Sequence, residues 1–125
     1  MYATQMQAYR KVEKLTETGR DIEASVLNQA ALKLTECQLN WDAADRDARL
    51  SEALRFNQII WSIFQGELAK EDNPLPKKLK QDILSLSLFI DKRIIDVLAN
   101  PLRDKLDIII SINLSLAAGL RGNPA

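Results

Sequence analysis

Apolar side chains recur every three or four residues along almost the whole 125-residue chain. This spacing places them on one face of an α-helix, whereas a half-buried strand alternates strictly between apolar and polar residues. All four prolines and three of the four glycines fall between the periodic segments or near the C-terminal end, as helix boundaries do. The pattern therefore predicts an all-α fold, a compact single-domain bundle of about five helices over residues 1–125.

The first two predicted helices span residues 3–17 and 20–40. Gly19 lies between them and is expected to end the first helix in a left-handed conformation. One apolar stripe of the first helix consists of Tyr2, Met6, Tyr9 and Val12. The stripe of the second helix consists of Leu27, Ala30, Ala31, Leu34, Cys37 and Trp41. Cys37 is therefore predicted to be a small core residue.

A third helix is expected to begin between residues 42 and 47. Its apolar positions alternate between steps of four and three, which is the spacing of a helix–helix seam: Leu50, Leu54, Asn57, Trp61, Phe64 and Leu68. Asn57 is the polar exception. A buried asparagine in a seam either fixes the register of the helices or bonds a loop carbonyl, and the sequence leaves both interpretations open.

The fourth predicted helix spans residues 76–99 and follows the proline-rich corner 73–76. It carries two apolar faces. The first contains Leu79, Ile83, Leu86, Ile90, Ile94 and Val97, and the second contains Leu84, Leu88, Ile95 and Leu98. Together they cover more than half of the helix circumference, so this helix is predicted to be either central or partly reserved for a partner.

A fifth helix is expected to begin at Asn100 and Pro101, an N-cap followed by a first-turn proline, and to continue to about residue 120. Residues 108–116 also alternate at strand period, but we favour a helix. The apolar run 108–120 is shorter than the ~20 residues needed to span a bilayer, and polar side chains interrupt it. No membrane insertion is therefore predicted.

Composition narrows the possible chemistry. Lys plus Arg and Asp plus Glu number 17 each, so no net field attracts nucleic acid or an anionic membrane. The chain has no His and one Cys, which removes His-based catalysis, His or thiolate metal sites and an intramolecular disulfide. We therefore expect no catalytic residues, no cofactor and no metal. The N-terminal residues do not resemble a secretory signal, and a cytoplasmic location is predicted.

Two binding functions are weighed on the residues alone. Lys77, Lys78 and Lys80 form a basic cluster at a helix start, but no aromatic residues are interleaved, so direct RNA or DNA binding is disfavoured. The surplus of apolar positions in 76–99 and 108–120 favours protein binding. A partner groove, a dimer interface and a well-filled core remain the three interpretations of that surplus.

Short motifs in order along the chain resemble the FlaF family of flagellar proteins. They read AY at 8–9, GRDIEA at 19–24, EAL at 52–54, WSIF at 61–64, NPLP at 73–76, LSLS at 84–87, DKR at 91–93, LDIII at 106–110, IN at 112–113 and AGL at 118–120. Each motif is weak alone, but together they span nearly the whole chain. The family pattern often has a basic residue at the position that Leu114 occupies in this chain. We therefore do not expect this chain to make any contact that the basic side chain makes in the family.

The resemblance implies a cytoplasmic protein of flagellum biogenesis that is needed for flagellin production or export. Flagellin is the expected partner, with the regulator FlbT as a second, and RNA enters only indirectly. Combined with the apolar surplus, it suggests a secretion chaperone that binds flagellin. The alternative is a post-transcriptional regulator acting through FlbT or flagellin mRNA. The predicted partner-binding residues are Leu88, Phe89, Ile95, Ile108, Ile112 and Leu116.

Overall fold

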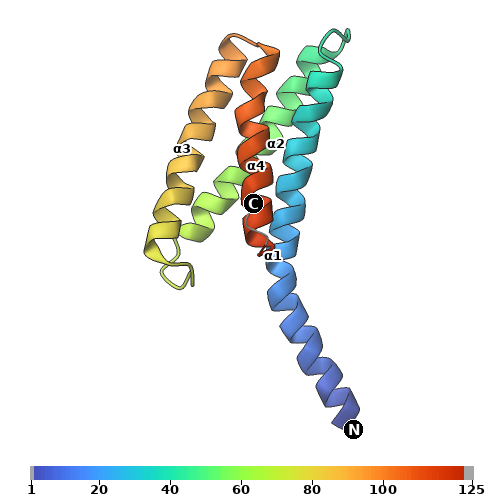
Figure 1. The fold of residues 1–125 in the computed structure, drawn as a ribbon, viewed down its shortest axis with the longest axis vertical. Helices are drawn as coiled ribbons and strands as arrows, with labels where there is room; N and C mark the ends of the chain where they lie inside the picture. The colour runs from blue at the N-terminus through green and yellow to red at the C-terminus, as the bar shows by residue number, and fades with distance from the viewer. Residues whose placement is uncertain (1, 123–125) are drawn as a thin grey trace.

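The computed structural model describes the backbone of residues 2–122 and the side chains of residues 20–122. It contains four α-helices, α1 (Tyr2–Leu39), α2 (Arg46–Leu68), α3 (Lys77–Ala99) and α4 (Asp107–Leu120), and a short 3-10 helix, η1 (Arg103–Leu106). Figure 1 shows them as a bundle. The described residues contain no strand, and the all-α prediction is confirmed.

The predicted helix boundary at Gly19 is wrong. One helix, α1, runs through this residue without interruption. A glycine inside a helix costs only about 1 kcal/mol relative to alanine, and no proline stands nearby to stop the helix. The first half of α1 extends beyond the rest of the bundle (Figure 1). The side chains of the stripe predicted for residues 2–12 lie outside those that the structure describes.

The start of the last helix also differs from the prediction. Asn100 does not begin a helix but ends α3, and its backbone N–H donates to the carbonyl of Asp96. Pro101 disfavours a helical conformation of the residue before it, and Asn100 accordingly has φ −147° and ψ 85°. The chain then passes through η1 before α4 begins at Asp107. The strand-period alternation in 108–116 is nevertheless part of a helix, as we predicted.

The main core lies between α1, α2 and α4. Helix α4 packs along α1, and α3 lies at the edge of the bundle, where it packs mainly on α2 (Figure 1). The predicted core stripe of α1 is buried at Leu27, Ala30, Ala31, Leu34 and Cys37. The seam of α2 is buried at Leu50, Leu54, Asn57, Trp61 and Leu68. The helical periodicity therefore identified the inward faces correctly.

A buried polar network joins the three core helices. The Asn57 side chain donates to the carbonyl oxygens of Ala30 on α1, at 3.2 Å, and Ala53 on α2, at 2.9 Å. Asn113 on α4 donates to the Asn57 side-chain oxygen at 2.6 Å and accepts from the indole N–H of Trp61 at 2.9 Å. The acceptor on α1 belongs to a helix, so the loop-carbonyl interpretation of Asn57 is wrong. Because each of these contacts requires one relative position of the helices, the network fixes their register.

None of the helices between residues 2 and 122 has both the length and the apolar character that a bilayer span requires.

Candidate protein-binding surface

Helix α3 leaves an unusual amount of apolar surface uncovered. Its inward face buries Ile83, Ser87, Ile90, Ile94 and Val97. The large apolar side chains exposed elsewhere on α3 are Leu79, Leu86, Leu88, Phe89, Ile95 and Leu98. Single exposed apolar residues are normal, but several on one helix indicate surface that is available to a partner.

An open groove runs between α2 and α3 on the outer side of the bundle, with a volume of about 710 Å³. We call it the α2–α3 groove. Its lining consists of Arg55, Gln58, Ile59, Ser62 and Ile63 from α2 and Asp91 and Ile95 from α3. The three isoleucines are about half exposed or more, at 49% for Ile59, 57% for Ile63 and 63% for Ile95. The groove therefore presents aliphatic side chains from both helices to solvent.

Polar contacts beside the groove tie α3 to α2. The side-chain amide of Gln65 donates to the hydroxyl oxygen of Ser87 and, at 3.3 Å, to the carboxylate of Asp91. Among residues 20–122, neither Asp91 nor Arg55 takes part in an ion pair. The groove therefore combines apolar walls with one charge of each sign that the described part of the chain leaves unpaired.

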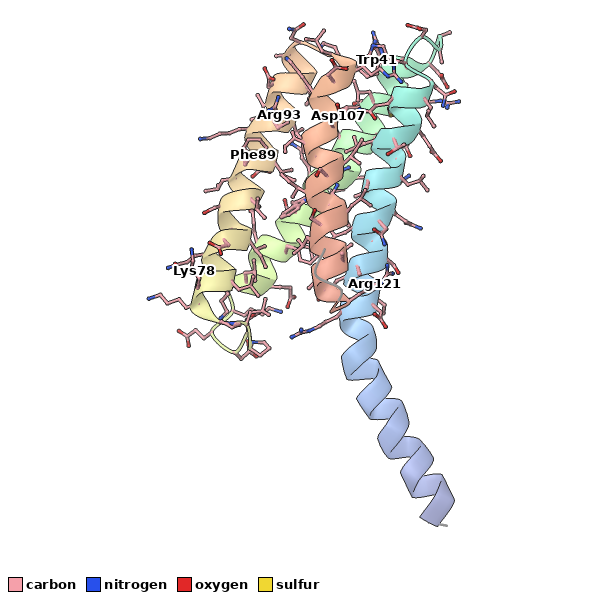
Figure 2. All side chains as sticks on the ribbon, in the orientation of Figure 1. Trp41, Lys78, Phe89, Arg93, Asp107 and Arg121 are labelled. Atoms are coloured by element: carbon pink, nitrogen blue, oxygen red, sulfur yellow. The ribbon has the colours of Figure 1, made fainter. Side chains whose placement is uncertain are left out.

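The other flank of α3, which lies toward α4, is more polar. The guanidinium of Arg93 lies 5.5 Å from the ring centre of Phe89. Asp96 is 3.9 Å from Arg93 and 3.0 Å from Lys105. Figure 2 shows Phe89 and Arg93 together on α3. Phe89 is therefore partly covered by a neighbouring cation and is 40% exposed, compared with 63% for Ile95 in the α2–α3 groove.

The structure divides the six predicted partner-binding residues among different surroundings. Leu88 is 62% exposed and, at helical spacing, shares the α2 side of α3 with Ile95. Phe89 lies about 120° around the helix from Ile95, on the opposite flank. Ile108 on α4 is 39% exposed, and Ile112 and Leu116 are partly buried against the core. The six residues do not form one continuous surface.

Sequence reasoning did not select Ile59 and Ile63. Both lie on α2 outside the stripe that forms the core seam, and they are four positions apart in the sequence. This spacing was visible in the sequence. It carries information only once α3 is known to pack beside α2, because the groove needs side chains from both helices.

The basic cluster lies where the sequence placed it, at the start of α3. Lys78 is paired with Asp82 one turn later, at 3.0 Å. An exposed pair of this kind is typical of a solvated helix face. The cluster therefore offers less free positive charge than its three lysines suggest.

Two buried or partly buried groups outside the groove, Cys37 and Glu23, have raised pKa values. Burial raises the pKa of the Cys37 thiol, which keeps it protonated and poorly reactive. Partial burial also raises the pKa of Glu23; Arg20 opposes this shift, and the carboxylate of Glu67 adds to it. Glu23 and Glu67 both line a small cavity of about 70 Å³ at the α3 start. Within the described residues, His, Cys, Asp and Glu side chains form no cluster suited to a metal ion.

The fold and this surface define a small helical bundle with a buried polar network and an uncovered apolar groove. A family model described as flagellar protein FlaF matches residues 5–120. The chain therefore belongs to the FlaF family of flagellar proteins, as its motifs indicated, and the match covers α2, α3, α4 and all but the first three residues of α1. Searches of curated proteins and of solved structures give no match.

Proposed function

We propose that this protein binds flagellin in the cytoplasm as a secretion chaperone and so supports the synthesis or export of flagellin. The observation that carries the proposal is the uncovered aliphatic surface of α2 and α3 in a chain of the FlaF family. A chaperone of this kind must cover an apolar helical face that would otherwise pair with other copies of the same protein. Exposed leucines and isoleucines supply that cover.

The rest of the molecule is consistent with such a task. Side-chain hydrogen bonds connect the core helices. Among the described residues, every buried side-chain N or O atom has a hydrogen-bond partner. A rigid core lets the binding surface remain exposed without collapsing inward. A binding partner that recognises only the folded state also stabilises it by mass action.

Isothermal titration calorimetry with purified monomeric flagellin tests the proposal. We expect saturable binding with a negative change in heat capacity, because apolar surface is removed from water. The titration is carried out without nucleic acid, so that RNA cannot act as a bridge. The absence of binding at tens of micromolar would contradict the proposal and favour the alternative, a regulator that acts through FlbT or flagellin mRNA. Titrations with FlbT and with the mRNA then separate those two.

A further inference from the structure

We infer that the α2–α3 groove is the site in which one amphipathic α-helix of the bound flagellin lies. This inference rests on the proposed function and deepens it by assigning the surface and the form of the ligand. The α4 side of α3, which includes Phe89, is then not the main contact.

The shape of the groove suits a helix. Ile59 and Ile63 form a ridge on α2, because residues four apart lie above one another on a helix. Leu88 and Ile95 form a second ridge on α3, and they are separated by two turns. The apolar side chains of an incoming helix, spaced at three and four residues, fit between two such ridges.

Small residues on α2 permit a close approach. Ser62 lines the groove, and Gly66 follows it by one turn on the same face. A Cβ atom added to Gly66 would meet nothing within 4 Å in this molecule, and its φ is not positive. Nothing within the described fold therefore requires glycine at this position, although glycine weakens a helix relative to alanine. A partner helix crossing at Ser62 and Gly66 accounts for it.

Charge and size specify the ligand further. Arg55 and Asp91 line the groove and have no ion-pair partner among residues 20–122, so the bound helix is expected to carry an acidic and a basic residue beside its apolar stripe. The groove is lined by seven residues. A stable interface between two folded proteins uses roughly 20 to 30 residues on each side, so one helix fits this groove better than a second copy of the bundle.

The test compares variants of the full chain by calorimetry with monomeric flagellin. Ile63→Asp and Ile95→Asp place a charge on each ridge, and Gly66→Leu fills the crossing point without adding charge. Leu32→Asp is the matched control, because Leu32 is 55% exposed on α1, outside the groove lining. Circular dichroism checks that each variant remains folded, and Gly66→Leu introduces a strong helix former at an open position.

We expect each groove variant to weaken binding at least ~10-fold, whereas Leu32→Asp and Phe89→Asp change it less than ~2-fold. Wild-type binding that the groove variants leave unchanged would overturn this inference and leave the proposed function standing. A loss of binding in Phe89→Asp alone would also overturn it and move the site to the α4 side. No binding by the wild-type protein would overturn both. If light scattering shows a dimer that Ile95→Asp dissociates, the groove belongs to a second copy and the inference fails.

Discussion

Helices α3 and α4 follow one another in the chain, yet the fold treats their apolar side chains differently. Helix α4 is held against α1 at both ends, since Gln38 donates to Asp107 at 2.6 Å and Arg121 donates to Ser25 at 3.1 Å. Helix α3 packs mainly on α2 and exposes four leucines, Phe89 and Ile95 along its length, whereas α4 exposes Ile108 and Leu114. Figure 2 shows Asp107 and Arg121 at opposite ends of α4.

This difference suggests that the apolar residues of α4 mainly stabilise the fold, whereas those on the outer face of α3 are available for binding. The middle of α4 enters the buried network through Asn113, so its apolar residues contribute to the folded state. Only one face of α3 is fully buried, and the apolar side chains on its outer face, such as Leu88 and Ile95, gain little from folding. A buried isoleucine of α4 and an isoleucine on the outer face of α3 should therefore respond very differently to mutation.

The largest effect is expected from isoleucine truncation. Ile109→Ala on α4 removes a fully buried side chain and should lower the free energy of unfolding by about 3–4 kcal/mol. Ile95→Ala on α3 should change it by less than about 0.5 kcal/mol, because most of that side chain is already in water. Urea unfolding measures both, and similar losses would contradict the contrast between the helices.

A smaller loss should follow from breaking the buried network. Asn113→Leu leaves the Trp61 indole N–H and the Asn57 side-chain oxygen without their partners, and should cost about 2–3 kcal/mol. Combining it with Asn57→Leu in a double-mutant cycle should give less than the sum of the two single losses. Strict additivity would show that the two asparagines do not act together.

Substitution of Gly66 is expected to raise the stability of the protein rather than lower it. Gly66→Ala should raise the free energy of unfolding by about 0.5 kcal/mol, because alanine favours the helix and no described atom is in the way. Thermal unfolding followed by circular dichroism measures the change. A destabilised Gly66→Ala protein would mean that the space beside α2 is occupied within the molecule itself.

The smallest effect concerns pH. Since the pKa of Glu23 is raised in the folded state above its ordinary value of 4.5, the folded state binds its proton more tightly. The contribution of Glu23 to stability therefore falls as pH rises through its folded-state pKa. Glu23→Gln should be slightly more stable than wild type near pH 7 and equal to it below the unfolded-state pKa. An unchanged difference across that range would contradict the shift.

Much of the fold could be predicted from the sequence, because helical periodicity reports directly which face is buried. The stripes through Leu34 on α1 and Leu54 on α2 are examples. The continuity of α1 could not be predicted, because a glycine is compatible both with a helix end and with a helix interior. Pro101 was interpreted as a first-turn residue although it follows the end of α3, since the same residue type serves at either boundary.

The candidate surface was only partly predictable. Leu88 and Ile95 stood out because α3 has more apolar positions than a surface helix needs. Helical spacing separates them from Phe89 by about 100° to 120°, but only the position of α2 in the structure shows which of the two flanks borders a neighbouring helix. For Ile112 and Leu116, partial burial against the core depends on how α4 lies in the bundle.

The most direct test of the account is a methyl NMR titration of the isoleucine-labelled protein with unlabelled monomeric flagellin. The account predicts that the methyl signals of Ile59, Ile63 and Ile95 shift on binding, while those of the buried Ile94 and Ile109 change little. Shifts concentrated at Ile108 and Ile112, or no shifts at saturating flagellin, would contradict it.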